Sequence, residues 1–378
     1  MYKVSRGVML IVLAASLLYS VRGQAQYAPS DEAGAVFVMN NSAVRNEVIS
    51  FTRGRDGSIQ KAGTFATGGR GSGGVTDPLE SQGALTLSQD RSLLFAVNAG
   101  SGELSVFRVH GSNLALVSRA ATQGSEPNAV AQHGNLVYVL NVGGSSNVVG
   151  FTLHFGGELR PIPHSIRFLT TNNSEAASLA FSPDGRFLLV SERATNNVEV
   201  FPVRSDGTLG SAVINSDLAP GTFAATIARN GAVIVSETGP NGGSNASTVS
   251  SYSLLTSGTL SPVSTGVPTL GDANCWNAVT PDGRYVYVSN AGSSTIAGFS
   301  IGTYGGLTPI GATVVGNNPT GSGNLDIAVS SDSKFLYSLN SGNGTIGIFG
   351  VQQDGTLINL GESEAISAKA GFNGIASF

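Results

Sequence analysis

The strongest constraint on the fold is a strand pattern that returns about every fifty residues. Each copy is a short apolar or β-branched run that follows a tight turn and ends on Asn or Glu. Aligned by their last residues, the seven runs are Ala35–Asn40, Leu93–Asn98, Leu136–Asn141, Phe187–Glu192, Ala232–Glu237, Tyr285–Asn290 and Phe335–Asn340. Seven copies of one antiparallel unit at this period predict an all-β fold, a seven-bladed β-propeller.

Turn motifs on both sides of these runs support the same fold. Pro183-Asp184-Gly185-Arg186 and Pro281-Asp282-Gly283-Arg284 precede the run in two copies, and motifs such as Asp206-Gly207-Thr208 follow the next strand. Proline presets φ for a turn and glycine supplies positive φ, so these motifs are interpreted as hairpin turns. A calcium loop would need further acids at a fixed spacing, which the motifs lack. The sequence therefore predicts no metal site and no cofactor.

The two ends of the repeat array predict how the ring closes. The first copy begins at its second strand, Ala35, whereas a leftover strand, Phe372–Ser377, follows the last copy. The leftover strand matches the inner strands Ala177–Ser182 and Leu325–Ser330. We expect this C-terminal strand to become the innermost strand of the first blade, because closure of the ring removes the exposed edges of an open sheet.

Residues 1–25 are interpreted as a secretory signal peptide. Lys3 and Arg6 make a basic start, Val8–Leu18 is apolar but short for a membrane span, and Gly23-Gln24-Ala25 fits a cleavage site. The alternative is a membrane anchor. Residues 26–34 would then be a short linker and residues 35–378 the propeller. No second apolar segment of spanning length follows, so we expect a secreted or periplasmic protein without a membrane span in the mature chain.

Charge and cysteine content exclude some classes of partner and crosslink. The net charge is −4, and removal of Lys3, Arg6 and Arg22 with the signal peptide would make it more negative. An acidic chain without a Lys/Arg cluster is not expected to bind nucleic acid. The single Cys275 excludes an internal disulfide. We expect a monomer with a small-molecule ligand.

The propeller face on which second strands end is the expected functional face. It carries the loops between second and third strands and the loops between successive blades, and we call it the top face. His110, His133 and His154 fall at the opposite face, and His164 falls in an outer strand. A histidine base or a histidine-ligated metal is therefore not expected at the top.

Two acids and an arginine are the candidate catalytic residues. Glu192 and Glu237 end second strands where the other five copies have Asn, and Arg193 follows Glu192. If both carboxylates faced one central opening, their repulsion would raise a pKa, or they would hold a cation. The alternative is that polar strand ends simply face water.

A second group of residues lies at or just before the starts of inner strands, on the same face. The candidate ligand-binding residues of this group are Glu175, Asn128, Trp276, Asn324 and Asn373. Glu80 and Glu126 have similar positions. Cys275 is interpreted as a packing residue, because free cysteine is among the most buried residue types and no His partner is expected nearby.

The repeats also resemble a known family. Phe181-Ser182-Pro183-Asp184-Gly185-Arg186 through Ser191-Glu192, followed by Asn197-Val198-Glu199-Val200-Phe201, resembles the seven-bladed lactonase family. That family includes propeller-type 6-phosphogluconolactonases and carboxymuconate-cyclising enzymes, and the resemblance covers about residues 35–378. The family often has a Pro-His pair where this chain has Glu175-Ala176. It also tends to carry a Glu at the end of a later second strand, and Glu237 fits that position.

Two functions remain open from the sequence. The resemblance implies a secreted lactone hydrolase or lactonising enzyme, with Glu237 or Glu192 as the general base and Arg193 stabilising the developing oxyanion. The alternative is a non-catalytic secreted propeller that binds a ligand or a protein on its top face. Low charge, Gly/Asn-rich loops such as Gly239–Asn245 and the missing family histidine favour this second function.

Overall fold

The computed structural model describes Met1 and residues 32–240, 243–363 and 366–378. The expected signal peptide, beyond Met1, and residues 26–31 of the expected linker lie outside the described residues. The described residues form β-strands, turns and loops, with no helix among them. None of the described segments is therefore a helix that could cross a membrane.

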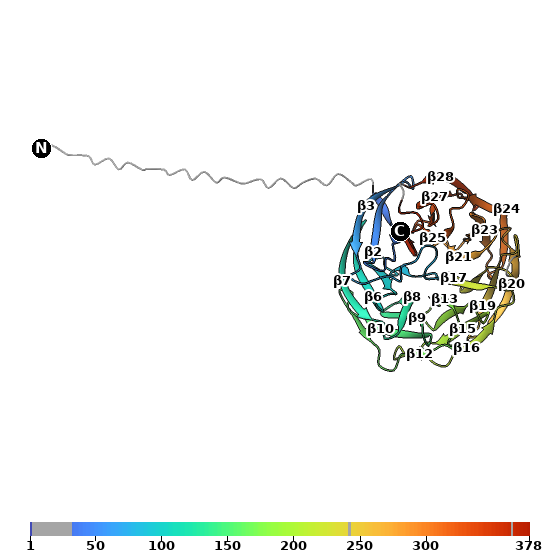
Figure 1. Cartoon of the computed structure of the whole chain (residues 1–378), viewed down its shortest axis with the longest axis horizontal. Coiled ribbons are helices and arrows are strands. Elements are labelled where there is room, and N and C mark those ends of the chain that lie inside the picture. Colours follow the sequence, from blue (N-terminus) through green and yellow to red (C-terminus); the bar gives the residue numbers. More distant parts are fainter. Residues whose placement is uncertain (2–31, 241–242, 364–365) are drawn as a thin grey trace. The chain divides into compact units, whose positions relative to one another are not determined.

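Seven antiparallel sheets surround a central axis, as the strand period predicted (Figure 1). From the axis outwards, the first four blades have the strand orders β29-β1-β2-β3, β4-β5-β6-β7, β8-β9-β10-β11 and β13-β14-β15-β16. Their strands are β29 (Ile375–Ser377), β1 (Glu32–Met39), β2 (Glu47–Gly54), β3 (Ile59–Ala66), β4 (Leu85–Leu87), β5 (Leu93–Asn98), β6 (Glu103–His110), β7 (Asn113–Ala121), β8 (Ser125–His133), β9 (Leu136–Gly143), β10 (Asn147–Leu153), β11 (Leu159–Pro161), β12 (Arg167–Phe168), β13 (Ala176–Phe181), β14 (Phe187–Glu192), β15 (Asn197–Pro202) and β16 (Val213–Ser216). Both β11 and β12 pair with β10, so the outer strand of blade 3 is split.

Blades 5 to 7 each contain four strands in sequence order. They are β17 (Thr222–Ile227), β18 (Ala232–Glu237), β19 (Thr248–Leu254) and β20 (Leu260–Pro268); β21 (Asn274–Val279), β22 (Tyr285–Asn290), β23 (Thr295–Ile301) and β24 (Leu307–Asn317); and β25 (Asn324–Val329), β26 (Phe335–Asn340), β27 (Thr345–Val351) and β28 (Leu357–Glu362). The second strands β5, β14, β18, β22 and β26 have the bounds predicted from the sequence.

The second strands form the cores of the blades. All six residues are buried in β5, β14, β18, β22 and β26, because each strand has a partner on both edges and an adjacent blade on both faces. This explains why these strands read as continuous apolar runs instead of alternating ones. The outer strand β28 is almost wholly exposed. Burial therefore decreases from the inner strands to the rim.

The C-terminal strand closes the ring as expected. Strand β29 pairs antiparallel with β1, with Phe37 opposite Ala376. The backbone N–H of Phe378 donates to Ala35 O (3.1 Å), and the buried Arg53 donates through Nε to Phe378 O (3.0 Å). On the other side, Asp326 of blade 7 accepts a bond from the Ile375 N–H (3.2 Å). The last strand thus joins the first blade to the seventh.

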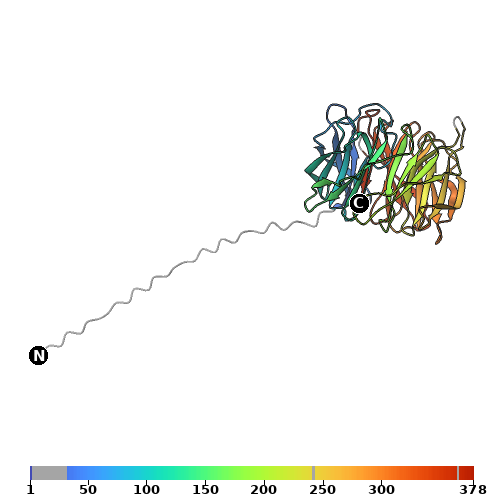
Figure 2. The ribbon, with the colours of Figure 1, turned by 90° about the horizontal axis from the view of Figure 1, so that it is seen from below.

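The Asp-Gly motifs are structural turns at the bottom face. Ser182 Oγ donates to Asp184 Oδ1 (2.7 Å), which also accepts from the Arg186 N–H, while Gly185 has φ +70°. Thr280 and Asp282 repeat this arrangement two blades later. The strands run between this face and the top face (Figure 2). The turns hold the hairpins and leave the top face to other loops.

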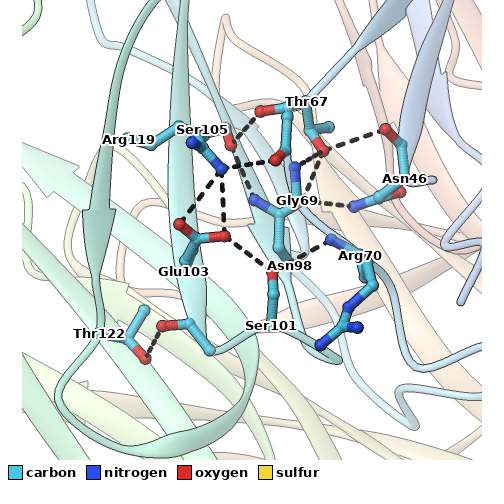
Figure 3. Close-up of polar contacts among 12 residues, drawn as sticks. Asn46, Thr67, Gly69, Arg70, Asn98, Ser101, Glu103, Ser105, Arg119 and Thr122 are labelled. Atoms are coloured by element: carbon cyan, nitrogen blue, oxygen red, sulfur yellow. Dashed lines mark hydrogen bonds and ion pairs between the residues drawn. The ribbon is translucent and has the colours of Figure 1, made fainter. Parts of the chain in front are cut away.

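Asn98 shows what the Asn at the end of a second strand does (Figure 3). Its Oδ1 accepts bonds from Asn46 Nδ2 (3.0 Å) and Thr67 Oγ1 (2.6 Å) of blade 1. Its Nδ2 donates to Ser105 Oγ (2.7 Å) in its own blade. The side chain is completely buried. An amide carries both the donor and the acceptor that this junction between blades needs.

Candidate functional site

The structure places Glu192 and Glu237 between blades and not on a shared opening. Both side chains are completely buried, and neither lines a cavity of the top face. This differs from the expected geometry, in which both carboxylates faced the mouth. The physical reason is that the end of a second strand lies at a blade junction, where Asn98 also lies. We therefore propose no direct part in catalysis for these two acids.

Each buried acid lies beside a second carboxyl group. Glu192 accepts a bond from Thr195 Oγ1 (2.5 Å) and neighbours the buried Glu199, which accepts a bond from the Thr170 N–H (2.8 Å). Burial raises the pKa of Glu192 to about 7, and the Glu199 carboxyl acts in the same direction. A protonated Glu192 avoids placing two negative charges side by side in the interior.

Glu237 repeats this arrangement at the next junction. Its partners are Thr248 and the carboxyl of Asp217, which also accepts bonds from Thr222 Oγ1 (2.7 Å) and Tyr252 OH (2.5 Å). Burial raises the pKa of Glu237 to about 8, and the Asp217 charge adds to this effect. The pKa of Asp217 is also raised, first by burial. Two successive junctions thus hold carboxyl pairs where most others use Asn.

These pairs should make the propeller less stable as pH rises. A carboxyl whose folded pKa exceeds its unfolded value stabilises the fold below the unfolded pKa, and this stabilisation is lost as pH rises through the folded pKa. For Glu192 and Glu237 the window runs from about pH 4.5 to about pH 8. We expect the free energy of unfolding, measured with urea, to fall by a few kcal/mol from pH 5 to pH 8. The Glu192→Gln/Glu237→Gln variant should lose part of that fall, because burial also raises the pKa of Asp77 and Asp326 and these two acids remain.

A matched control is Glu158→Gln, which changes a half-exposed acid of blade 3. That variant should keep the pH dependence of the parent chain. Equal slopes in the parent and the double variant would show that the two junction pairs do not titrate in this window.

Two cavities adjoin each other on the top face. Cavity A, of about 800 Å³, is lined by blades 4 to 6 and includes Asp77, Asn196, Phe223 and Cys275. Cavity B, of about 500 Å³, lies over blades 3 and 4 and includes Asn128. Glu80, Glu175 and Arg193 line both cavities. The volumes are those of ordinary small-molecule sites.

Arg193 is the centre of this surface. Its guanidinium ion-pairs with Glu80 and lies 3.1 Å from a Glu175 carboxylate oxygen. It also lies over the ring of Phe223, 5.5 Å from the ring centroid. The side chain is 27% exposed, so it remains accessible from the cavities. Two carboxylates and a ring hold the guanidinium in one place, which is the preorganisation that anion stabilisation requires.

A segment from the loop between blades 1 and 2, residues 77–83, crosses the mouth of the central channel; we call it the plug. Ser81 Oγ donates to Asn128 O (2.8 Å), and Trp276 Nε1 donates to Ser81 O (3.0 Å). Gln82 exchanges two bonds with the backbone of Asn277 and donates its N–H to Ala177 O. The plug thus contacts blades 3, 4 and 6, and it carries Glu80 to Arg193.

Asp77, at the start of the plug, has a shifted pKa. Asn373 Nδ2 donates to its Oδ1 (2.8 Å). Burial raises the pKa of Asp77 to about 7; the Glu80 charge acts in the same direction, while Asn373 and Arg193 oppose it. A carboxyl with this pKa, lining a cavity next to an arginine, is suited to take up a proton near neutral pH.

The structure divides the expected ligand-binding residues into two groups. Glu175 and Asn128 line a cavity, as does the expected catalytic residue Arg193. Trp276, Asn324 and Asn373 are buried beneath the surface. Trp276 packs edge-on against Phe223 (ring centroids 5.2 Å apart) and holds the plug, while Asn324 donates to Ser289 Oγ (2.6 Å). Trp276 and Asn373 support the site from below through Ser81 and Asp77, whereas Asn324 lies at the junction of blades 6 and 7.

The repeat pattern of the sequence did not indicate two residues of the site, Asp77 and Phe223. Asp77 belongs to a loop that has no counterpart in the other blades, and Phe223 is an apolar residue of an inner strand. Cys275, expected to be a packing residue, is mostly buried yet lines cavity A, and burial raises the pKa of its thiol. Its raised pKa disfavours the thiolate that a nucleophile needs.

The backbone around the mouth is strained at four acids, of which Asp77 (φ +41°) and Glu80 (φ +45°) belong to the plug. Glu126 and Glu175 have φ values of +53° and +48°. Glu175 directly precedes Ala176, where β13 begins to pair, and the same place holds Gly221 in blade 5, Ala273 (φ +52°) in blade 6 and Gly323 in blade 7. Glu126 lies between the paired residues Ser125 and Pro127 of β8. A left-handed conformation costs a non-glycine residue about 1 kcal/mol or more. The left-handed conformation at the Glu175 place is therefore a feature of the repeat, and blade 4 fills it with an acid that lines both cavities.

The four histidines lie away from this surface, as the sequence predicted. None of them lines cavity A or cavity B, and His133 lies at the bottom turn beside Gln89. Within the part of the chain that the structure describes, no group of three or more His, Cys, Asp or Glu side chains is placed to bind a metal ion.

No family model and no curated protein matches the sequence. Among solved structures, a candidate 6-phosphogluconolactonase of Bacteroides fragilis superposes with a TM-score of 0.70 at 16% identity, over 93% of this chain and 99% of the other. A second one, from Bacteroides uniformis, has a TM-score of 0.70 at 18% identity, over 92% and 100%.

The periplasmic gluconolactonase of Pseudomonas aeruginosa has a TM-score of 0.64 at 17% identity, over 88% of this chain and 97% of the other. Likeness at such identities concerns the fold, because one fold hosts many activities. The fold that the sequence resemblance implied is therefore confirmed: this chain has the seven-bladed propeller fold of the gluconolactonase-like structures.

Proposed function

We propose that the chain is a lactonase that hydrolyses its substrate in cavity A. The observation that carries this proposal is Arg193, which two carboxylates and an aromatic ring hold at the wall of a polar cavity. A fixed cation is what a tetrahedral oxyanion needs. Asp77 supplies the second required group, a base whose pKa is raised to about 7. The fold shared with gluconolactonase-like structures agrees with this reaction type.

The reaction needs one proton transfer to the enzyme and one from it. The Asp77 carboxylate accepts a proton from water as the water oxygen attacks the lactone carbonyl carbon. Arg193 stabilises the oxyanion that forms. When the intermediate collapses, the ring C–O bond breaks, and the proton held by Asp77 passes to the departing alkoxide. The product is the open-chain hydroxy acid.

The charge of the site favours an uncharged substrate. Asp77, Glu80, Glu126 and Glu175 line the two cavities, whereas Arg193 is the one Lys or Arg among the described residues that line them. This arginine is already paired with two acids. A phosphorylated lactone would meet an excess of negative charge, which costs binding energy. We infer that a neutral sugar lactone is preferred over its phosphate ester.

The proposal is tested by hydrolysis of glucono-1,5-lactone with and without calcium, beside the 6-phosphorylated lactone. We expect metal-independent turnover of the neutral lactone and an activity that rises with pH through about 7, because Asp77 must be deprotonated. Asp77→Asn keeps the oxygen that accepts the Asn373 bond but removes the base. It should lower kcat by on the order of a hundredfold or more.

Asp354→Asn, in a bottom-face turn, is the matched control and should leave kcat unchanged. If the Asp77→Asn variant kept the kcat and the pH profile of the parent, Asp77 would not be the general base. If no lactone is turned over, the chain is better explained as a propeller that only binds its ligand.

We also propose that the chain is exported after cleavage behind Ala25. The basic start, the short apolar run and the Gly23-Gln24-Ala25 sequence support this. The mass of the protein recovered from a culture identifies the new N-terminus. A mature chain that begins at Gln26 is the expected result, and retention of residues 1–25 would contradict it.

A further inference from the structure

The space on the top face extends well beyond cavity A. Cavity B shares Glu80, Glu175 and Arg193 with it, and a third cavity of about 460 Å³, cavity C, shares Glu126 with cavity B. Cavity C includes Ser101 and Ser125 of blades 2 and 3. The three cavities therefore follow one another from blade 6 back to blade 2, and one ligand can run from cavity A into cavity B without leaving the surface.

The walls of cavity B are built for hydroxyl groups. Glu126 and Glu175 are strong acceptors at its rim, and Asn172 and Asn173 bring amides that both donate and accept. Asn128, only 2% exposed, uses its Nδ2 to bind Ala176 O (2.8 Å). Its Oδ1 has no hydrogen-bond partner among the described residues. A buried acceptor without a donor is costly unless a water or a ligand satisfies it.

The charges that line cavity B further restrict the class of ligand that it can bind. The described lining of cavity B has acids and amides, and its one basic side chain is Arg193, which is shared with cavity A. An anionic extension would be repelled, and an apolar one would leave Asn128 Oδ1 and the carboxylates without donors. A neutral chain rich in hydroxyl groups satisfies both conditions, because each hydroxyl can donate to a carboxylate or to the amide oxygen.

We propose that the preferred substrate is the lactone of an oligosaccharide, with the lactone ring in cavity A and at least one glycosyl unit in cavity B. This inference rests on the proposed function for the identity of the reacting group, while the glycosyl site in cavity B rests on the geometry. Glu175, shared with cavity A, and Glu126, shared with cavity C, then provide one acid at each end of cavity B.

The first experiment compares kcat/KM for cellobiono-1,5-lactone, maltobiono-1,5-lactone and glucono-1,5-lactone. We expect at least one disaccharide lactone to exceed the monosaccharide lactone by tenfold or more. The two disaccharides distinguish β-1,4 from α-1,4 linkage. In Asn173→Tyr, a ring fills part of cavity B, and the ratio of disaccharide to monosaccharide kcat/KM should fall to about 1. Asn113→Tyr, on an exposed residue at a bottom turn, is the control and should keep the ratio.

The second experiment separates this inference from the proposed function. Calorimetry with cellobiitol, maltitol and glucitol measures binding without any lactone to hydrolyse. We expect tighter binding of one disaccharide alcohol by at least tenfold, and loss of this difference in Asn173→Tyr. Failure of all lactone hydrolysis would overturn the proposed function alone. Equal binding of the mono- and disaccharide alcohols, or a difference that Asn173→Tyr leaves intact, would overturn the glycosyl site.

Discussion

Removal of residues 372–378 should abolish the folded propeller or lower its Tm by at least about 10 °C. The deletion removes β29 and the buried side chains of Phe372 and Ile375, and it exposes the edge of β1. Truncation of one buried large side chain typically costs 2–5 kcal/mol, and a domain of this size loses a few degrees of Tm for each kcal/mol. Arg53 would also lose Phe378 O, its partner in the interior. Soluble yield and thermal melting followed by circular dichroism are the measurements.

A circularly permuted chain, in which the last strand is moved in front of β1, is the control for this deletion. The Phe378 N–H bonds to Ala35 O, so the last residue already lies beside the start of β1. A chain in which residues 371–378, followed by a short glycine turn, precede residue 33 would supply the same inner strand from the other end. We expect this chain to fold and to melt close to the parent. A deleted chain that melts like the parent would show that β29 is dispensable for closure.

The fold was predictable because the same sequence pattern occurs in every blade. The second strand is buried on both faces in every blade, so the same apolar run and the same terminal Asn return. The closing strand was predictable for the same reason: Phe372–Ser377 had the pattern of an inner strand but no blade of its own. In both cases a short stretch of sequence had the residues that its place in the blade requires.

The positions of Glu192 and Glu237 were not predictable from the same alignment alone, although a correlated signal is present. Before three of the Asn strands the chain reads Thr67-Gly68-Gly69, Thr122-Gln123-Gly124 and Thr269-Leu270-Gly271. A Cβ on the final glycine would lie 2.4–2.6 Å from a side-chain atom of Asn98, Asn141 or Asn290. The equivalent segment before Glu237 is Asp217-Leu218-Ala219. In this blade Glu replaces the Asn at the strand end, and the preceding segment also loses its Thr-x-Gly pattern. The joint change indicates that the two are packed against each other at the junction.

The plug could not be predicted because nothing in the repeat resembles it. Glu80 is separated from Arg193 by more than a hundred positions, and the two side chains pair because one loop crosses the channel. The same loop brings Asp77 to the wall of cavity A. The bonds of Gln82 to Ala177 and Asn277 that fix this loop involve backbone groups, which carry no residue-specific signal. Arg193 itself was identified from its place after a second strand, and the structure supplied its partners.

Arg193→Gln should lower kcat/KM for the neutral lactone by about a hundredfold to a thousandfold, the range seen when one oxyanion donor is removed. The loss has two causes: the cation that stabilises the oxyanion disappears, and Glu80 and Glu175 lose the group that holds them. Arg193→Lys should recover only part of the activity. A lysine has one nitrogen, which cannot take the places of the two guanidinium nitrogens that contact Glu80 and Glu175. Initial rates over a range of lactone concentrations separate kcat from KM.

Arg186→Gln is a close structural match on the opposite face. Arg186 pairs with Asp184 (2.6 Å) and lies over the ring of Phe187, 6.0 Å from its centroid, so it repeats the ion pair and the ring contact of Arg193. Both pairs are partly exposed and contribute little to stability, so both variants should melt within a few degrees of the parent. The activity of Arg186→Gln should match the parent. If Arg193→Gln and Arg186→Gln had equal kcat/KM, the guanidinium at the wall of cavity A would have no part in the chemistry, and the lactonase mechanism proposed for this propeller would fail.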